Sequence, residues 1–371
     1  MYGYYGFGNV GDDLLLSSVI SGLSRFAPDT RFIVRSLNPV ANTLDERIQY
    51  VALEKIMARV AWPRWRRLVC YAWETWLSLR GCSHLVFGGG TLFHARKGSS
   101  VNLGLIAMLV VMARLRGARV FALGVGVASL PQGTPKRLME IILILAQDFA
   151  VRDASSLANC QHLCGVSRVR RTADLVFGLS LAETPRIPGN QPVLGITLAA
   201  SDVGNDGLGN EAFLGNLASA LACLQGRGWD IRLLSFQEVD VDGIKVSDSS
   251  LFAILHRYGF RPAAETIRVS SHPAEIARQF KDIDVIAGMR FHGHVLSALM
   301  GIPFVGFGRD SKLADLCVHF SMPFLAMSDF QSEHLVKAVE QARGQAPNRE
   351  TTLSLSNAAA ENFYSIEASI S

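Results

Sequence analysis

The chain has 371 residues, of which 49% are hydrophobic and 18% charged, so it can bury large cores and is not a disordered protein. Its net charge is +4, and the basic residues are scattered apart from one local cluster. This mild charge favours acidic small molecules or an anionic membrane surface over DNA as partners. We expect two domains of ordinary size and no nucleic-acid partner.

The six cysteines show no spacing typical of a metal site. Cys160 and Cys164 flank His162, but two cysteines four residues apart on a helix are more often buried thiols, and we expect no metal. The first residues lack a charged leader followed by an apolar core. The apolar stretches 103–113 and 141–146 are shorter than the roughly 20 residues that span a bilayer. These features predict a reduced, cytoplasmic protein.

The first expected helix, residues 14–26, follows a glycine-rich loop, residues 3–13. Three glycines formally fit the dinucleotide fingerprint G-x-G-x-x-G: Gly6, Gly8 and Gly11. However, almost no strand precedes them, and the next strand ends in Arg35 where that fingerprint requires an acidic residue. Asp12 and Asp13 would also repel a pyrophosphate. These two carboxylates suit sugar hydroxyls or a proton transfer; alternatively, they only cap the helix.

Residues 55–80 mix basic and aromatic side chains. Arginines and tryptophans interleave there: Arg59, Trp62, Arg64, Trp65, Arg66, Arg67, Trp73, Trp76 and Arg80. Such a mixture is typical of a helix that lies on an anionic membrane surface. The alternative is a helical segment whose tryptophans pack on the sheet.

Strands and helices then alternate through the first half of the chain. The strand 83–87 ends in Gly88, Gly89, Gly90 and Thr91, where a ligand can approach the backbone closely. The further expected elements are strands 119–123, 148–151 and 169–171 and helices 102–116, 136–147 and 155–163. Several of these strands end in Gly, Arg or Asp, including Arg152. This alternation predicts a parallel, doubly wound sheet.

Residues 181–192 contain three prolines and a glycine and form the best candidate linker. A second alternation follows it, with strands 193–198, 231–235, 265–269, 283–287 and 304–307 and helices 211–225, 249–258, 273–279, 294–300, 312–320, about 328–341 and a helical tail from 348. The sequence thus predicts an α/β protein with two doubly wound Rossmann-like domains, residues 1–182 and 193–345, and a C-terminal helical tail, residues 346–371. We expect the ligand in a central cleft that the two domains face.

Residues 282–294, DIDVIAGMRFHGH, carry the strongest local signal. A short apolar strand gives way at Gly288 to a helix, and this edge of an open α/β sheet is where ligands bind. Arg290 adds a cation and His292 a group that titrates near neutrality, at a helix start that favours anions. Alternatively, Arg290 pairs with a nearby carboxylate, and both His292 and His294 are surface residues. His294 lies further into the helix, where a structural role is favoured.

With these residues in place, the chain resembles the polysaccharide pyruvyl transferase family over most of its length. Six motifs in order carry the resemblance: residues 3–13 (GYYGFGNVGDD), 87–92 (FGGGTL), 150–155 (AVRDAS), 172–177 (TADLVF), 290–292 (RFH) and 301–303 (GIP). The chain departs from the family at its nearly absent first strand and after residue 303. There the family often has a tyrosine followed by a lysine, whereas this chain keeps only a lysine, Lys312.

The resemblance implies a fold like that of the GT-B glycosyltransferases, and transfer of pyruvate from phosphoenolpyruvate onto two sugar hydroxyls with release of phosphate. It implies no cofactor besides this donor, an acceptor sugar that is free or lipid-linked, acceptor binding in the first domain and donor binding in the second. Peripheral contact with the inner face of the membrane would bring the enzyme to lipid-linked acceptors.

The chemistry of this donor assigns roles to the residues already singled out. We expect Arg290 and Arg152 to hold the carboxylate and phosphate, because the guanidinium fork binds such groups in bidentate fashion. His292 is the first candidate for the acid, and Asp12 or Asp13 for the base. The other residues expected at the substrates are Gly8, Asn9, Gly89, Gly90 and Lys312.

Two other readings remain open. The first is a GT-B glycosyltransferase that uses a nucleotide sugar; the closely spaced glutamate pair that many such enzymes carry is absent from residues 290–320. The second is a protein that binds an acidic metabolite or a glycan without turnover.

Overall fold

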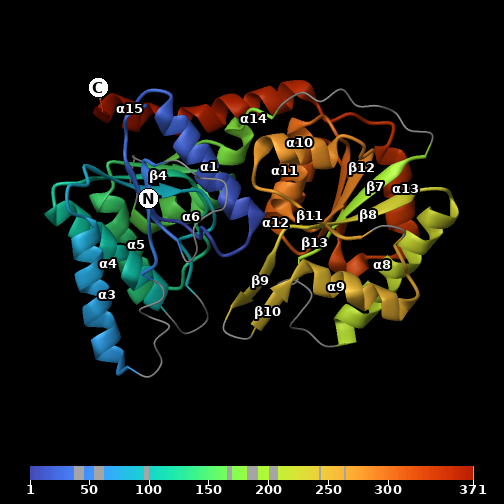
Figure 1. Ribbon diagram of the computed structural model, residues 1–371, viewed down its shortest axis with the longest axis horizontal. Helices are drawn as coiled ribbons and strands as arrows, with labels where there is room; N and C mark the ends of the chain where they lie inside the picture. Colours follow the sequence, from blue (N-terminus) through green and yellow to red (C-terminus); the bar gives the residue numbers. More distant parts are fainter. Residues whose placement is uncertain are drawn as a thin grey trace. The chain divides into compact units, whose positions relative to one another are not determined.

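The computed structural model describes residues 1–36, 46–53, 62–95, 100–164, 169–181, 191–199, 208–241, 244–262 and 265–370. The chain forms two compact units, each built around a parallel sheet (Figure 1). Unit 1 comprises Met1–Phe7, Asp12–Gly178 and Leu355–Ser371, and unit 2 comprises Gly8–Gly11 and Leu179–Ser354. Most of the predicted linker and Arg59 lie outside the described residues.

Unit 1 contains the four-stranded parallel sheet that the alternation predicted. Its strands stand in chain order: β3 (His84–Gly88), β4 (Arg119–Val125), β5 (Asp148–Val151) and β6 (Val169–Arg171). The helices between and beside them are α3 (Arg64–Ser78), α4 (Val101–Leu115), α5 (Thr134–Leu145) and α6 (Ala154–Cys164). Their apolar faces enclose a core in which the rings of Phe87, Phe93 and Phe149 meet with centroids 5.2–5.5 Å apart.

A second, two-stranded parallel sheet in unit 1 pairs β1 (Phe32–Arg35) with β2 (Ile48–Val51), a strand that was not predicted. Met1 and Tyr2 lie between β1 and β3. The Arg35 N–H donates to the Met1 carbonyl at 3.1 Å, and the Tyr2 N–H donates to the Val86 carbonyl at 2.9 Å. These two residues therefore occupy the position of a first strand between β1 and β3.

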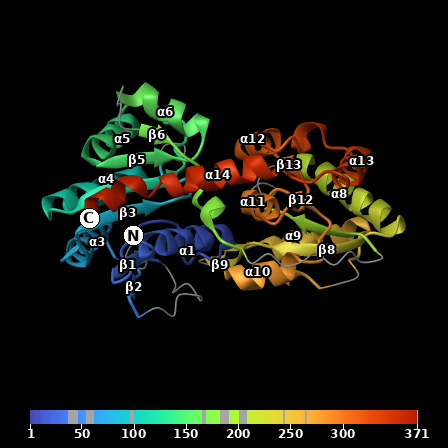
Figure 2. The same cartoon turned by 90° about the horizontal axis from the view of Figure 1, so that it is seen from above.

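Helix α1 (Val10–Ser24) starts four residues before the expected Leu14, and it places Asp12 and Asp13 in its first turn, as predicted. At the other end of the chain, the predicted tail forms α14 (Arg349–Glu361) and α15 (Tyr364–Ile370), drawn in red in Figure 2. From Leu355 this tail belongs to unit 1. The fully buried Asn362 fixes it there, because its amide donates to the Ala173 carbonyl and accepts from the Thr172 hydroxyl.

Unit 2 has a six-stranded parallel sheet in the order β11-β8-β7-β12-β13-β14. These strands are β7 (Val193–Thr197), β8 (Asp230–Ser235), β11 (Ile267–Arg268), β12 (Val285–Gly288), β13 (Phe304–Gly308) and β14 (Phe324–Ala326). Numbered along the chain, the order is 3-2-1-4-5-6, which is that of the Rossmann fold. The strand order reverses between β7 and β12, and ligands of such sheets bind beyond the carboxyl ends of these two strands.

Helices cover both faces of this sheet. Figure 1 shows α10 (Pro273–Phe280), α11 (Phe291–Leu299) and α12 (Ser311–His319) on one face and α8 (Leu208–Gly226), α9 (Asp248–Leu255) and α13 (Ser332–Ala342) on the other. An antiparallel hairpin, β9 (Glu238–Val241) and β10 (Ile244–Ser247), follows β8. Neither this hairpin nor β14 was predicted from the sequence.

Candidate functional site

The candidate site of unit 2 lies where β12 passes into α11, beside the carboxyl end of β7. Gly288 ends β12 against Thr197, and a Cβ on this glycine would lie 1.9 Å from the Thr197 hydroxyl. The glycine therefore lets the two strands end side by side. Arg290 is the residue that caps α11, and His292 lies in the first turn of that helix. This confirms the predicted change from strand to helix around Arg290.

Arg290 forms a buried ion pair that only the alternative interpretation anticipated. Its Nε donates to Asp248 at 3.0 Å and to the Leu198 carbonyl at 3.1 Å, and its Nη2 donates to Asp248 and to the Gln237 amide oxygen. Asp248 is fully buried and also accepts the backbone N–H groups of Phe236 and Gln237. The pair compensates the charge of Arg290 and fixes its guanidinium, so Arg290 acts here as an oriented donor rather than as an unpaired cation.

Residues Gly8–Gly11 of the opening loop belong to the same site. The Val10 N–H donates to the Phe236 carbonyl at 2.9 Å, and the Glu238 N–H donates to the Gly8 carbonyl at 3.3 Å. The Asn9 side chain accepts the Gly11 N–H at 3.1 Å, as expected of a residue that caps α1. Gly8 and Asn9 are therefore held beside the residues that bind Asp248.

His292 packs directly on this loop. A Cβ on Gly11 would lie only 2.0 Å from His292 Nδ1, so the imidazole occupies the space that a side chain there would need. His294 has a different environment: it is fully buried, with Nδ1 2.9 Å from the Arg290 carbonyl and Nε2 3.1 Å from the Val305 carbonyl. Burial lowers the pKa of His294. His294 therefore lies inside the helix, as expected, but it is buried and is not the surface residue of the alternative interpretation.

Lys312 lies at the same edge of the sheet, in the first turn of α12, which follows the neighbouring strand β13. The carboxylate of Asp310 caps this helix by accepting the Lys312 N–H at 2.9 Å. By contrast, the residue that caps α11, Arg290, makes no side-chain hydrogen bond to its helix. The carboxylate of Asp310 thus already occupies the start of α12, whereas the residue that caps α11 supplies no carboxylate.

The predicted acid–base residues Asp12 and Asp13 lie in unit 1. Asp13 accepts the Gly6 N–H at 2.9 Å. Burial raises the pKa of Asp13 to about 6, assisted by the negative charge of Asp12 and opposed by the Gly6 hydrogen bond. A carboxyl group with a pKa close to neutrality suits proton transfer, so Asp13 is the stronger candidate of the two.

The glycine turn after β3 packs on α1. Gly89 and Gly90 have φ values of +67° and +72°, which favour glycine. A Cβ on Gly89 would lie 2.4 Å from Leu15, whereas one on Gly90 would lie 3.5 Å from an Asp12 carboxylate oxygen. The packed Leu15 side chain therefore leaves no room for a side chain at Gly89, so a ligand that approaches the backbone is not needed to explain this glycine. Gly90 faces the Asp12 carboxylate.

Arg152 joins three of the motifs that carried the family resemblance. Its Nη1 donates to Asp174 at 2.8 Å and its Nη2 to the Thr91 hydroxyl at 3.1 Å, while Nε lies 3.6 Å from Asp153. The side chains of Arg152 and Asp174 are 6% and 2% exposed. Arg152 thus holds the glycine turn, the start of α6 and the segment after β6 together.

Sequence reasoning did not find Asp248, Gln237 or Glu238. Burial acts to raise the pKa of Glu238, but hydrogen bonds from Ser235, Ser247 and Ser249 outweigh it and the pKa lies below its ordinary value. Gln237 and Asp248 flank the unpredicted hairpin and Glu238 is its first residue, and no local pattern marks these residues. Within the described ranges, no group of three or more His, Cys, Asp or Glu side chains is arranged to hold a metal ion.

A family model described as polysaccharide pyruvyl transferase matches residues 9–311, which include the end of the opening loop, the glycine turn, Arg152 and Arg290. The chain belongs to the polysaccharide pyruvyl transferase family. A comparison of this pyruvyl transferase family member with curated proteins found no match.

Solved structures show the fold of this family member. The UDP-GlcNAc 2-epimerase from Methanocaldococcus jannaschii has 11% sequence identity and a TM-score of 0.65, and the match covers 96% of each chain. HepE from Anabaena, solved in complex with UDP and glucose, has 13% identity and a TM-score of 0.58 over 98% of this chain and 96% of its own. The galactosyltransferase WaaB of the lipopolysaccharide outer core has 11% identity and a TM-score of 0.56 over 99% and 98%. The predicted GT-B-like fold with two Rossmann-like domains is confirmed.

Proposed function

We propose that the chain transfers pyruvate from phosphoenolpyruvate onto two hydroxyls of a sugar, in a polysaccharide or in its lipid-linked precursor, forming a cyclic ketal and releasing phosphate. The observation that carries this proposal is the start of α11 at the strand-order reversal of unit 2. There, Arg290 is fixed by Asp248 and His292 lies in the first turn of the helix. An oriented guanidinium at a helix start whose capping residue makes no side-chain hydrogen bond to the helix suits a small, doubly anionic ligand.

Arg290 and the N-terminus of α11 bind the donor in this proposal. Lys312 supplies a further positive charge, because Asp248 neutralises the charge of Arg290. The contacts to Asp248, Leu198 and Gln237 use Nε and Nη2, so Nη1 is the nitrogen that these contacts leave for a ligand. Arg152 has all three nitrogens near Asp174, Thr91 or Asp153. We therefore assign Arg152 to holding the glycine turn and keep its direct donor contact as a prediction to test.

The reaction needs one proton on carbon and two attacks by hydroxyls. A general acid protonates the methylene carbon of phosphoenolpyruvate, and the first sugar hydroxyl adds to C2 as a base takes its proton. The bond between C2 and the phosphate oxygen then breaks, and phosphate leaves. The second hydroxyl adds to C2, loses its proton and closes the ketal ring.

His292 is the proposed acid, and Asp13 the proposed base, with Asp12 beside it to bind the acceptor. Two observations support this assignment: the raised pKa of Asp13, and the contact between His292 and Gly11, the residue that immediately precedes Asp12. A carboxylate that takes up a proton near pH 6 can accept one from a hydroxyl and return it within the same cycle.

The experiment is incubation of the protein with phosphoenolpyruvate and a panel of free and lipid-linked glycosides, following phosphate release and the mass of the glycoside. Phosphate release that requires both substrates, together with a pyruvylated glycoside, supports the proposal. The solved structure of HepE contains UDP and glucose, so the rival activity is sugar transfer from a nucleotide sugar. Release of UDP from a UDP-sugar with no use of phosphoenolpyruvate would establish that rival, and tight binding without any product would indicate a binding protein.

A further inference from the structure

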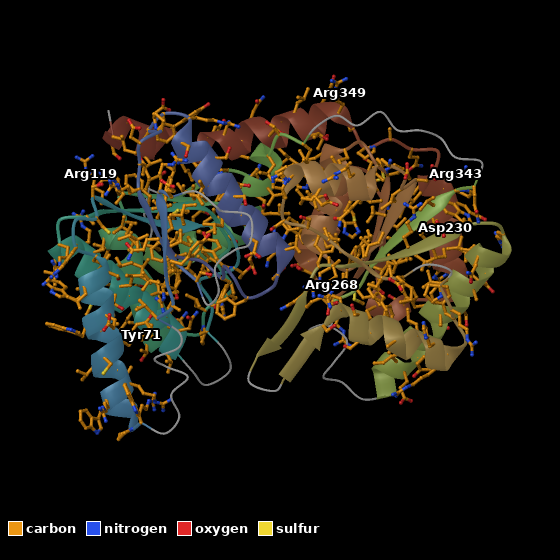
Figure 3. All side chains as sticks on the ribbon, viewed as in Figure 1. Tyr71, Arg119, Asp230, Arg268, Arg343 and Arg349 are labelled. Carbon is orange, nitrogen blue, oxygen red and sulfur yellow. The ribbon has the colours of Figure 1, made fainter. Side chains whose placement is uncertain are left out.

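Helix α3 of unit 1 exposes large apolar side chains along one stripe. Trp65, Val69 and Trp73 follow each other at four-residue spacing, which places them on one face, and they are 68%, 60% and 60% exposed. Leu68 adds a further side chain that is 38% exposed. The opposite side of the helix holds it in the unit, where the fully buried Tyr71 points inward (Figure 3). The exposed stripe is therefore not needed for the packing of α3.

Positive charge borders this stripe. Helix α3 contains three arginines and one glutamate, a net charge of +2 from 3 − 1. Arg64, Arg66 and Arg67 all lie in its first turn, where the helix dipole disfavours cations, so interaction with the dipole does not account for their position. The Arg66 guanidinium lies over the Trp62 ring, 4.5 Å from its centroid, which keeps the cation at the apolar surface.

The neighbouring helix α4, which packs against α3, continues this character. Val111 and Leu115 are 38% and 73% exposed. Arg116, just past the end of α4, lies 3.8 Å from the ring centroid of Trp76 on α3. We name the exposed side chains of the two helices the α3–α4 surface: Trp65, Leu68, Val69, Trp73, Val111 and Leu115, bordered by the four arginines.

We propose that the α3–α4 surface docks the protein on an anionic lipid bilayer, with α3 lying in the plane of the interface. Tryptophan places an apolar ring and a polar N–H at headgroup depth, and arginine binds lipid phosphates, which is the composition of interfacial helices. In the described part of the chain, no helix is long and apolar enough to cross a membrane.

A bilayer fits this surface better than a protein partner. Trp65, Val69 and Trp73 lie on one helix face with arginines beside them, which is the pattern of a helix that lies on a membrane surface. A cationic rim around two tryptophans also complements anionic headgroups without any matching pocket. The inference goes beyond the proposed function, because pyruvate transfer to a free glycoside does not need it, and its test contains no phosphoenolpyruvate.

The test is co-sedimentation of the full chain with phosphatidylglycerol–phosphatidylcholine vesicles and with phosphatidylcholine vesicles, at low and at high salt. We expect binding to the anionic vesicles at low salt, weakened by salt. Trp65→Gln with Trp73→Gln should lose at least tenfold in binding, because the apolar contact is removed. Arg64→Gln, Arg66→Gln and Arg67→Gln together should lose about 100-fold, since each basic residue near the surface contributes about fivefold.

A matched control removes the same charge elsewhere. Arg257, Arg261 and Arg349 are exposed residues of unit 2, and Arg349 projects outward at the start of α14 (Figure 3). Changing these three to glutamine should leave vesicle binding within twofold of the wild type. Equal losses in the control and in the α3 triple variant would overturn the proposal, as would a wild type that does not sediment with anionic vesicles. A dimer in solution that the tryptophan variant abolishes would also overturn it, because the surface would then be a protein interface.

Discussion

Two arginines with similar surroundings occupy the two units and differ in what they hold. Arg290 follows β12 and pairs with Asp248, and Arg152 follows β5 and pairs with Asp174. The four side chains are at most 12% exposed. A buried arginine–aspartate pair at the carboxyl end of a parallel strand is thus a shared feature of both units.

The helix starts beside these pairs are different. Asp153 caps α6 by accepting the Ser156 N–H at 2.7 Å, so a carboxylate already lies at the helix start beside Arg152. Burial acts to raise the pKa of Asp153, but the hydrogen bonds from Ser155 and Ser156 and the positive charge of Arg152 outweigh burial, so the pKa lies below its ordinary value. At α11 the capping residue is Arg290 itself, without a side-chain bond to the helix. The same local pattern therefore braces the glycine turn in unit 1, and in unit 2 it carries the proposed donor site.

The largest effect is expected at His292, which has no counterpart beside Arg152. His292→Ala should lower kcat by about 10²–10⁴-fold, the usual contribution of general acid–base catalysis, with little change in stability. Steady-state phosphate release, with thermal unfolding as the control, measures both. Activity within threefold of the wild type would remove His292 from the proton transfer.

Replacing Asp248 and Asp174 in turn compares the Arg290–Asp248 pair directly with the Arg152–Asp174 pair. Asp248→Ala leaves the Arg290 cation without its counter-ion and the backbone N–H groups of Phe236 and Gln237 without this acceptor, and should cost about 3–5 kcal/mol of unfolding free energy. Asp174→Ala should cost a similar amount, but only Asp248→Ala should also weaken phosphoenolpyruvate binding. Urea unfolding and calorimetric titration measure the two quantities. Equal losses of affinity would show that both pairs serve the donor.

Asp13 predicts an unusual pH dependence of stability. Its pKa is about 6 in the folded protein and about 4 in the unfolded chain, so the unfolded state ionises first as the pH rises. Its contribution to stability is therefore lost between about pH 4 and pH 6 and stays lost above. Asp13→Asn should raise the unfolding free energy by of order 2 kcal/mol at pH 8 and by much less at pH 4. A difference that grows as the pH falls would contradict the raised pKa.

Conservative replacement of the two arginines should separate donor binding from bracing. Arg290→Lys loses the forked geometry and should raise the KM for phosphoenolpyruvate about tenfold. Arg152→Lys should leave this KM within twofold of the wild type and act mainly on stability. If the two variants raise this KM equally, Arg152 is a second donor ligand, as the sequence analysis first predicted.

Local sequence signals predicted the elements that are long or strongly apolar. The runs of apolar residues before Gly88 and Gly288 were sufficient to place β3 and β12, and the change to helical spacing placed Arg290 at a helix start. The order of the strands, and thus the reversal beside β7, follows from packing over long sequence separations, and no local pattern shows it.

The hydrogen-bond partners of the predicted site residues could not be predicted either, because they are also far away in the sequence. Asp248 is 42 residues from Arg290 and follows a short, polar hairpin that has no strong strand signal. Likewise, the spacing of Asp12 and Asp13 predicts two carboxylates at a helix start but not which of them is buried against Gly6. The sequence predicted the glycine turn, but only the packing of Leu15 in the structure explains why residue 89 is a glycine.

The most direct test of the central claim follows the donor carbon itself. The protein is incubated with an acceptor glycoside and phosphoenolpyruvate that carries carbon-13 at C2, and the label and free phosphate are followed together by NMR. We expect a new quaternary ketal carbon that appears in equal amount with phosphate, and we expect both to appear at least about 100-fold more slowly with His292→Ala. Phosphate without a ketal carbon, or a labelled donor left unchanged while a nucleotide sugar is consumed, would contradict it.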